Sequence, residues 1–501
     1  MSLITSWLPI LLMILSLLPL LLIFPKRKPT KLPPGPPQLP IIGNLHQLGN
    51  LSHRSLWQLS EKYGPLMYLK LGSLPALVIS SSKLASDVMK TQDLIFCNRP
   101  LFVSYKKISY NFLDLAFAPY GEYYRDMRKI CNNELFSIKR VQSFGFIREE
   151  EVAGMIALIS HSASSSTPVN LTDIMFSLTS TIIGRAAFGK CYQGGEKSNF
   201  HDAFGVVQAL LTTFFFADYI PLLGWMDVVT GQQARLEKCF RDMNVIWEQV
   251  IDEHLDPMRV KREQEDLVDV LIQVQKDLHL TRDHIKALLM DVFIAGTETG
   301  AATVVWAMTE LIRKPRVMKK VQDEIRRIIG NKGKVEEDDL DKLDYFKLVV
   351  KETFRMHPAA PMLITRETTQ QCRLDGYNIA PKTLVFINAL AIGHEAESWK
   401  NPGEFWPERF TDSPIDYKGQ DFQFIPFGAG RRICPGMHFG VVTVEIALAN
   451  LLYSFIWELP SGMNKEDVDM SELPGIAVHK KSPLLLVPIK CIDITNGKTN
   501  E

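Results

Sequence analysis

A single cysteine, Cys434, stands in the stretch PFGAGRRICPG (residues 426–436) among glycines and directly after two arginines. No second cysteine for a disulfide and no further ligands for a zinc site lie near it in the sequence. The apolar run that follows predicts a helix, so free backbone N–H groups and the helix dipole would favour a thiolate at Cys434. A thiolate among small and positively charged residues is suited to bind the iron of a haem.

The residues around the cysteine have expected roles in such a site. We expect Gly430 and Gly436 to let the backbone approach a porphyrin face, Phe427 to shield the sulfur, and Arg432 to bind an anionic propionate. Arg431 has no expected role. The alternative is a structural cysteine in a glycine-rich turn, which is the commoner situation for an isolated cysteine. The combined spacing FxxGxRxCxG argues against this alternative.

A second motif, AGTETG (residues 295–300), interrupts an apolar run that predicts one helix over residues 285–312. Glycines, hydroxyls and a carboxylate destabilise the middle of an apolar helix, so their presence indicates a function. Ala295 and Gly296 would leave room above a flat ligand, and the Thr299 hydroxyl can bond the carbonyl four residues back and open the helix to water. We interpret the motif as a pocket for O₂, against the alternative of a polar patch on a helix surface.

These motifs resemble those of the cytochrome P-450 superfamily, whose haem-binding loop matches the Cys434 loop position for position. Further motifs follow in the family's order over nearly the whole chain: LPPGPP, AGTET at 295–299, KETFR at 351–355 and PERF at 407–410. The residues of these motifs are similar to those of the plant A-type clan. The resemblance implies a mainly α fold with small β-sheets (α+β) and a haem b cofactor with Cys434 as its axial thiolate ligand.

The resemblance also implies two catalytic residues. Thr299 and Glu298 would serve proton delivery during O₂ activation, Thr299 by hydrogen bonding and Glu298 through water. Gly300 departs from the family pattern, because many relatives carry Ser or Thr at this position.

Three further cofactor-binding residues follow from the resemblance. In APYGEYYRDMRK (residues 118–129), Arg128 matches an arginine that binds a haem propionate. Tyr124 stands where the family has a tryptophan, so its hydroxyl would have to donate the bond that an indole N–H gives elsewhere. Arg366 matches another propionate-binding arginine. The neighbouring Arg125 and Lys129 could add to a basic face for an acidic reductase, or form an ordinary solvated helix face.

A charge pair is expected behind the haem loop. Glu352 and Arg355 have the i,i+3 spacing of an ion pair on one helix face. Several other Glu–Arg pairs in the chain have the same spacing, so the spacing alone does not discriminate. The position before PERF selects this pair, and the resemblance implies that Arg409 completes a buried network that serves the fold.

The resemblance places substrate contacts in variable loops and along the helix that carries AGTET. The corresponding residues are nearly all apolar, which predicts a hydrophobic substrate, although each could equally be ordinary core. They are Phe112, Phe214, Phe215, Phe293, Ile294, Ala295, Ala360, Met362, Leu363, Ile476 and Ala477.

The N-terminus predicts a membrane anchor. Residues 3–24 are almost wholly apolar, and a helix of this length would rise about 33 Å, enough to cross a bilayer core. A cleaved signal peptide is the alternative, but the basic residues follow the apolar run and no small-residue cleavage site is present. We therefore expect a transmembrane signal-anchor (1–24) with its N-terminus in the lumen of the endoplasmic reticulum, a basic and proline-rich hinge (25–40), and a cytosolic catalytic domain (41–501).

Composition excludes some functions and leaves others open. Lys and Arg together number 56, as do Asp and Glu, so no basic excess argues for nucleic acid. The seven cysteines are scattered and odd in number, which favours free thiols in a reducing compartment. Helical spacing is expected over residues 123–136, 171–187, 232–254, 282–313, 317–330 and 344–356, and strands over 67–72, 76–81 and roughly 374–388.

These inferences together predict a membrane-anchored haem-thiolate monooxygenase. It would insert one atom of O₂ into an apolar small molecule of plant metabolism, with terpenoid and alkaloid scaffolds favoured, and take electrons from NADPH through a separate flavoprotein reductase. GAGRRI lacks the third glycine of a dinucleotide-binding motif, so the chain itself is not expected to bind NADPH. The alternatives are a haem-thiolate isomerase or dehydratase and a membrane-tethered haem-binding protein without turnover.

Overall fold

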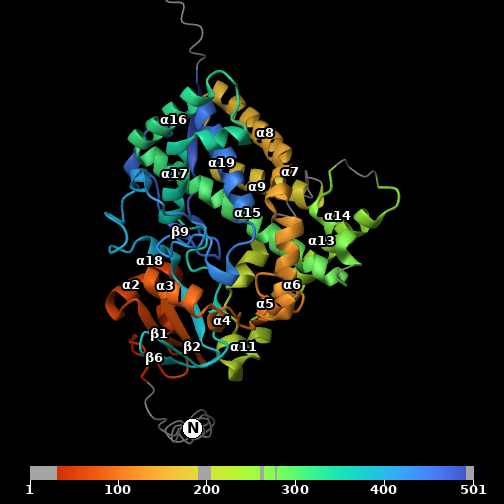
Figure 1. Cartoon of the computed structure of the whole chain (residues 1–501), viewed down its shortest axis with the longest axis vertical. Helices are drawn as coiled ribbons and strands as arrows, with labels where there is room; N and C mark the ends of the chain where they lie inside the picture. Colours follow the sequence, from red (N-terminus) through yellow and green to blue (C-terminus); the bar gives the residue numbers. More distant parts are fainter. Residues whose placement is uncertain (1–30, 190–204, 260–263, 277–278, 492–501) are drawn as a thin grey trace, which may run out of the picture.

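The computed structural model describes residues 31–189, 205–259, 264–276 and 279–491, and helices dominate this part of the chain (Figure 1). The longer helices are α2 (Ser52–Tyr63), α6 (Glu122–Ile130), α8 (Gly145–Ser164), α9 (Leu171–Phe188), α13 (Gln232–Leu255), α14 (Leu267–Gln275), α15 (Arg282–Arg313), α16 (Pro315–Ile329), α17 (Asp344–Met356) and α19 (Met437–Ser454). The shorter ones are α3 (Ser82–Ser86), α4 (Asp93–Phe96), α5 (Val103–Ile108), α7 (Ile138–Ser143), α11 (Phe216–Tyr219), α12 (Met226–Val229) and α18 (Ala389–Gly393). The expected membrane helix, the first part of the hinge and Cys191 lie outside the described residues.

The strands form small sheets at the periphery of the helical body. The largest sheet has the order β1-β2-β7-β4, with β2 and β7 parallel and the other pairs antiparallel. Its strands are β1 (Leu66–Leu71), β2 (Leu74–Ile79), β4 (Arg366–Glu367) and β7 (Leu384–Ile387). A second sheet has the order β3-β11-β8, and two pairs stand alone. Their strands are β3 (Val169–Asn170), β8 (Phe455–Glu458), β11 (Leu485–Lys490), β5 (Cys372–Leu374) with β6 (Tyr377–Ile379), and β9 (Glu472–Leu473) with β10 (His479–Lys480).

Helix α15 runs through the centre of the molecule and packs along α9 and against α19 and α17 (Figure 1). It is apolar on most sides, as expected of a helix that neighbours cover all round. Pro315 stands in the first turn of α16, where a proline is tolerated, and separates the two helices. Both α15 and α19 are long and apolar enough to cross a membrane, but here most of their surface is buried inside the protein.

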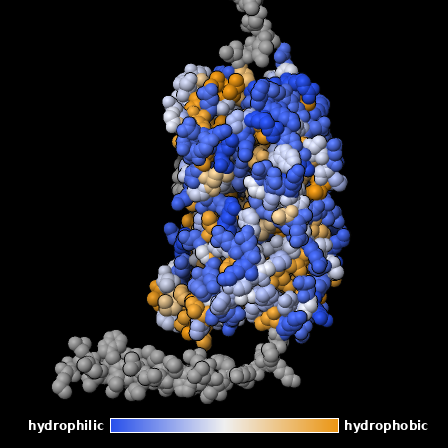
Figure 2. Space-filling model, turned by 90° about the vertical axis from the view of Figure 1, so that its left-hand side faces the viewer, coloured by the Kyte–Doolittle hydropathy of each residue, from blue (hydrophilic) through white to orange (hydrophobic). Residues whose placement is uncertain are grey.

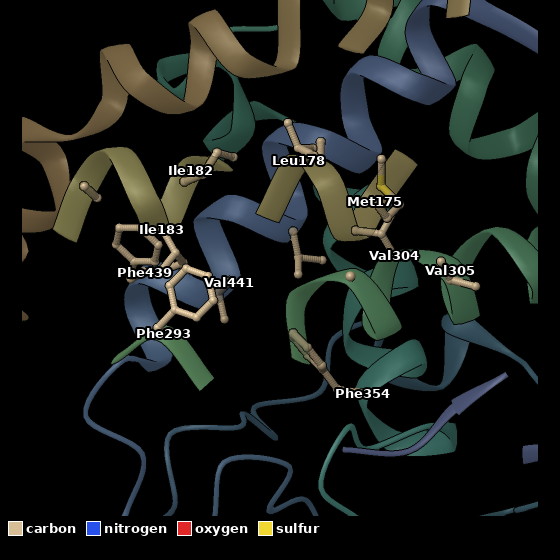
Figure 3. Packing of buried hydrophobic residues seen from close by; sticks show 14 of the residues in the cluster. Met175, Leu178, Ile182, Ile183, Phe293, Val304, Val305, Phe354, Phe439 and Val441 are labelled. Atoms are coloured by element: carbon tan, nitrogen blue, oxygen red, sulfur yellow. The ribbon is translucent and has the colours of Figure 1, made fainter. Parts of the chain in front are cut away.

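The core around the site comes from four helices that converge on one another. Figure 3 shows Ile183 of α9 beside Phe293 of α15, with Phe439 and Val441 of α19 close by. Phe354 of α17 belongs to the same cluster of buried residues. Dense packing therefore fixes the two places that carry the sequence motifs. These are the middle of α15, with AGTETG, and the start of α19, directly after the cysteine loop.

A buried charge network ties α17 to the segment that precedes the cysteine loop. Arg355 Nε and Nη2 each lie 2.7 Å from a Glu352 oxygen, and both side chains are 0% exposed. Arg409 Nε lies 3.0 Å from Glu352 Oε1. The other Arg355 donors bond the carbonyls of Gly393, Pro402 and Glu404. The structure thus joins all three residues of the expected network.

The outer surface is mostly polar, but apolar side chains gather at the lower end of the described protein, where α11 lies (Figures 1 and 2). The segment 221–229 exposes Leu222, Trp225, Val228 and Val229, and Leu222 is 91% accessible. Ile41 is exposed as well. The turn after β1 connects the segment around residue 41 with the segment 221–229. The amide of residue 72 donates to the carbonyl of residue 42, and the amide of residue 73 donates to the carbonyl of residue 219. We call these exposed residues the apolar rim.

The fold predicted from the sequence is confirmed. The expected helix over 282–313 and that over 344–356 match α15 and α17 at both ends, and the expected hairpin is the antiparallel pair β1–β2. The one helix expected over 123–136 is instead α6 followed by a wider π-helical turn, Cys131–Leu135. A turn of this kind inserts an extra residue into the helical ladder and is common near functional sites.

Candidate active site

The cysteine loop turns back on itself before α19 begins. The Cys434 amide donates to the Phe427 carbonyl at 3.0 Å. Gly430 has a positive φ of 67°, and a Cβ there would lie 2.2 Å from the Met89 carbonyl oxygen. Gly430 is therefore required for packing against Met89, and its approach to a porphyrin stays a prediction. At Gly436 a Cβ would meet only a ring carbon of Phe136, at 3.8 Å, so this position does leave space.

The Cys434 sulfur lies deep in the protein, yet the residue keeps accessible surface. Burial raises the pKa of the Cys434 thiol, while a hydrogen bond from the Gly436 amide and the charge of Arg128 act in the opposite direction. Desolvation is therefore the largest influence on the Cys434 thiol in the protein. A bound metal cation would remove the proton. The Phe427 ring packs edge-on against Phe354, with centroids 5.1 Å apart, and so supports the loop.

Arg432 reaches from the cysteine loop to the loop before α6. Its guanidinium donates to the carbonyls of Cys97 at 2.8 Å, Ala118 at 2.6 Å and Leu115 at 3.4 Å, and stacks over the Tyr124 ring at 3.8 Å from its centroid. A guanidinium has five N–H donors, so Arg432 retains donors that these bonds do not use.

Arg366 lies in the same buried region. It donates to Asp93 Oδ1 at 3.1 Å and to the Ala429 carbonyl at 3.0 Å. Arg431, which had no expected role, holds the other oxygen of this carboxylate with its backbone amide at 2.8 Å, and its Nε donates to the Tyr120 hydroxyl at 3.1 Å. Asp93 thus pins the cysteine loop to α4.

Sequence reasoning missed a third buried arginine, Arg99. It donates to the carbonyls of Ala116, Ile364 and Thr365, at 2.9, 2.6 and 2.9 Å. Burial, together with the nearby charges of Arg432 and Arg366, lowers the pKa of Arg99 well below its usual value. The only sequence signal would have been an arginine directly before a proline, which has many other uses.

The two expected residues of α6 differ in their bonding. Arg128 makes no hydrogen bond or ion pair within the described part of the chain, and its charge acts on Cys434. The Tyr124 hydroxyl donates its one hydrogen to the Arg431 carbonyl at 2.8 Å. This bond occupies the Tyr124 hydroxyl within the described chain, and its bond to a propionate stays a prediction.

The structure shows α15 as one continuous helix through the AGTETG motif. The Thr299 hydroxyl donates to the Ala295 carbonyl at 2.6 Å, the expected bond four residues back. A Cβ at Gly296 would lie 2.4 Å from Ile183 Cδ1, so Gly296 serves the packing of α15 on α9, and room for a ligand there stays a prediction. At Gly300 a Cβ would lie 3.3 Å from the methyl group of Thr179, which explains the small residue at this departure from the family pattern.

Glu298 has a partner that sequence reasoning missed. Its Oε2 lies 3.2 Å from His479 Nε2, which brings β10 against the middle of α15. The His479 ring packs beside Phe176 at 5.0 Å, and its Nδ1 is buried without a partner among the described residues. No spacing in the sequence links these two residues.

The expected substrate residues differ in exposure. Phe215, Phe293 and Ala477 are buried, and Phe293 stacks on Phe188 at 5.8 Å, which places it in the core. Phe214 is exposed and stacks on Tyr219 at 5.1 Å. Partly accessible surface remains at Phe112, Ile294, Ala360, Met362, Leu363 and Ile476.

The donor set fits a flat, anionic, metal-bearing ligand. Ala295 is exposed although it lies in the middle of the central helix, so an open space adjoins that turn of α15. Arg99, Arg366 and Arg432 are all buried, and among them only Arg366 pairs directly with a carboxylate in the described residues. Buried positive charge without a counter-charge is unfavourable, and the carboxylates of a haem would supply that charge. The free Cys434 thiol supplies one soft metal ligand.

Comparisons with known proteins agree with this chemistry. A family model described as Cytochrome P450 matches residues 33–487. Cytochrome P450 71A1 of Persea americana is 52% identical over 89% of this chain and 91% of its own. Strychnine-11-hydroxylase of Strychnos nux-vomica is 50% identical over 92% of each chain. A zebrafish cytochrome P450 structure with progesterone covers 87% of this chain and 99% of its own with a TM-score of 0.75, at 24% identity, a likeness of fold.

The chain therefore belongs to the cytochrome P450 family, and its relatives place it with plant members. The family consists of haem-thiolate monooxygenases, so the family match implies a haem iron bound by a cysteine thiolate.

Proposed function

We propose that the protein inserts one atom of O₂ into an apolar small molecule of plant metabolism and reduces the other atom to water. The observation that carries the proposal is the free Cys434 thiol near a set of buried arginines, of which only Arg366 pairs with a carboxylate among the described residues. Bound haem would supply the iron at which O₂ is activated. Cys434 would hold the iron, and Arg128, Arg366 and Arg432 would hold the propionates.

Residues of α15 would handle the protons of this reaction. The Thr299 hydroxyl has its hydrogen on the Ala295 carbonyl, which leaves its oxygen lone pairs free to accept a hydrogen bond from water. The Glu298 carboxylate, one residue earlier, would exchange protons with such water. Contact with His479 Nε2 fixes the orientation of that carboxylate.

We further propose that two electrons come from NADPH through a separate flavoprotein reductase. The chain offers a basic face for an acidic partner at Arg125 and Lys129, both exposed on α6 next to the site. Opposite charges of this kind guide association and act mainly on its rate.

The substrate is proposed to be a terpenoid or an alkaloid. Support comes from the apolar character of the expected pocket residues and from the 50% identical relative, whose name describes hydroxylation of the alkaloid strychnine. Pocket specificity can turn on single side chains, so the class is proposed and not the molecule.

The protein is proposed to sit on the endoplasmic reticulum membrane, anchored by residues 1–24 with the catalytic part in the cytosol. The apolar rim supports this placement, because exposed apolar patches at one end of a protein mark contact with lipid or protein. An apolar substrate dissolved in the bilayer would then be close to the enzyme.

Turnover with purified reductase tests the proposal against its alternatives. The full-length protein is incubated with reductase, NADPH and a panel of terpenoids and alkaloids, and consumption of NADPH and O₂ is compared with product. A monooxygenase couples all three, and the oxygen of the product derives from ¹⁸O₂. Product without NADPH would identify an isomerase or dehydratase. Spectral shifts on ligand addition without turnover across the panel would favour a haem-binding protein.

A further inference from the structure

The loop between α5 and α6 is held in a strained conformation. Tyr110, Asn111 and Phe112 all have positive φ, at 52°, 63° and 66°. Such values are unfavourable for residues other than glycine and persist only where surrounding contacts enforce them. Phe112 is one of the expected substrate contacts, so the contacts that hold this loop also shape the pocket.

Helix α15 supplies one of these contacts through a carboxylate. Asp291 Oδ2 accepts hydrogen bonds from the amides of Leu115 at 2.7 Å and Ala116 at 3.1 Å. Asp291 stands one helical turn before Ala295, so the same part of α15 that carries the oxygen-binding motif also carries the loop.

A second carboxyl group faces the first. Asp114 is 1% exposed, and its Oδ2 accepts the Phe117 amide at 2.9 Å. Its Oδ1 is buried and has no donor among the described residues. Asp114 directly precedes Leu115, whose amide Asp291 binds, so the two carboxyl groups are neighbours on the same turn. Two ionised carboxylates there would repel each other and have no hydrogen to share, whereas a proton on Asp114 Oδ1 satisfies the orphan atom and can be donated to Asp291.

We propose that Asp114 and Asp291 share one proton, and that this acid–carboxylate pair latches the loop that carries Phe112 onto α15, so that the pocket loop loosens in alkali. The latch is a property of the fold, and its effect on substrate binding rests on the proposed function.

The titration behaviour of the two groups agrees with this arrangement. Burial, followed by the charge of Asp291, raises the pKa of Asp114 well above its usual value. Burial also raises the pKa of Asp291, to about 6, while the amides of Leu115 and Ala116 and the bond to Asp114 act against that rise. The rise is larger for Asp114, so Asp114 is the group of the pair that keeps the shared proton.

Other charged and titratable groups face the pair from the elements around it. The Arg432 guanidinium lowers the pKa of Asp114, and Arg99 binds the same loop through the Ala116 carbonyl. Burial raises the pKa of Tyr123, whose hydroxyl donates to the Leu113 carbonyl, and raises that of Cys131 to about 12. Neither group ionises near neutral pH, so the two carboxyls carry the proposed pH dependence.

The sign of the effect follows from the raised pKa values. Both carboxyls bind protons more tightly in the folded than in the unfolded chain, where an aspartate has a pKa of about 4. Their contribution to stability is therefore complete below about pH 4 and is lost as the pH rises through the folded values, first through that of Asp291 and then through the higher one of Asp114. The latch loses its shared proton last.

Asp114→Asn tests the shared proton directly. Asparagine has the shape of the protonated acid, and its amide can donate to Asp291 without a titrating proton. Thermal unfolding of the holoprotein is followed from about pH 5 to about pH 9. The variant is expected to unfold at a temperature no lower than the wild type at neutral pH, with a difference in its favour that grows with pH. The infrared difference spectrum of wild type minus variant should show the carbonyl stretch of one protonated carboxylic acid.

Asp227→Asn is the matched control. Asp227 is also buried and accepts two backbone amides, Phe216 at 2.8 Å and Ala217 at 2.9 Å, one with each oxygen. Asparagine has one acceptor oxygen, so this variant should be less stable across the whole pH range. If Asp114→Asn behaved like the control, or the carboxylic acid band were missing in the wild type, the shared proton would be wrong.

Two further measurements complete the test. Asp291→Asn can accept both amides with its oxygen and donate to Asp114, so it should also flatten the pH dependence. It serves as the test if Asp114→Asn does not fold, and an unchanged slope would overturn the proposal. Hydrogen exchange of the amides at 115 and 116, corrected for intrinsic base catalysis, should rise in alkali in the wild type and stay slow in Asp114→Asn. These readouts need no substrate, so failure of turnover alone would affect only the proposed function.

Discussion

Two buried arginine networks of the described protein differ in completeness. In the network around Glu352, every donor of Arg355 has an acceptor in the protein, from the carboxylate and from backbone carbonyls. In the set made by Arg99, Arg366 and Arg432, each guanidinium keeps unused donors, and Arg128 beside it uses none among the described residues.

The difference separates structure from binding. A buried cation with all its donors satisfied has no capacity for a ligand, so the first network serves the fold. A set with unused donors and excess positive charge is stable only if an anion completes it. We therefore regard the first as closed and the second as open, and the following variants test that distinction.

Breaking the closed network should give the largest effect. Arg355→Met leaves the Glu352 carboxylate buried with Arg409 as its one remaining cation, which should lower the free energy of unfolding by about 3–5 kcal/mol. Urea denaturation of both apoprotein and holoprotein measures the loss, which should be the same in each. Arg313→Met is the control, because its pair with Glu310 has the same spacing but a distance of 3.9 Å, and it should change stability by less than about 1 kcal/mol. A loss confined to the holoprotein would contradict a purely structural role.

Removing a cation next to the open arginine set should speed the release of haem and leave the stability of the apoprotein unchanged. Arg128→Gln takes away a guanidinium without protein partners in the described chain, so the stability of the apoprotein should not change. A charged hydrogen bond to a propionate contributes about 1.5–3 kcal/mol, so haem should be released roughly 10- to 100-fold faster. Transfer of haem to apomyoglobin measures the rate, with Arg125→Gln on the same helix as the control. A destabilised apoprotein with unchanged haem release would show that the open set is structural after all.

In the AGTETG motif of α15, Thr299→Ala should uncouple NADPH consumption from product formation. NADPH use should continue while peroxide replaces product, with product per NADPH falling by about tenfold. Thr303→Ala is the control, because its hydroxyl makes the same bond four residues back, to the Thr299 carbonyl, in a buried position. Unchanged product per NADPH in Thr299→Ala would remove this residue from proton delivery.

The smallest effect is expected at Tyr124. Because its hydroxyl bonds the Arg431 carbonyl, Tyr124→Phe should cost about 1 kcal/mol of stability and leave haem release unchanged. Denaturation and haem transfer measure the two quantities. Faster haem release would support the propionate bond first expected for this tyrosine.

Most of the fold could be predicted from the sequence because its signals are local. The long apolar periodicity of residues 282–313 and the paired β-like runs defined α15 and the first hairpin with nearly correct ends. The π-helical turn after α6 could not be predicted, since no residue in Cys131–Leu135 breaks a helical pattern.

The site was predictable where a motif carries it and not where distant residues meet. Cys434, Arg432 and Thr299 follow from compact motifs. Arg99 and the Asp114–Asp291 pair could not be found, because their partners are remote in sequence and their positions carry no spacing signal. The close protein neighbours of Gly296 and Gly430 could not be predicted either, because Ile183 and Met89 are remote from them in sequence.

The central claim is that Cys434 is the thiolate ligand of a haem, and the absorption of the reduced carbonyl complex tests it most directly. The wild-type protein should give the red-shifted band of a thiolate-bound haem. Cys434→His, which offers a neutral nitrogen in place of the sulfur, should shift the band to that of a histidine-bound haem, and Cys434→Ala should lose the red-shifted band altogether. Persistence of that band in Cys434→Ala would contradict the account.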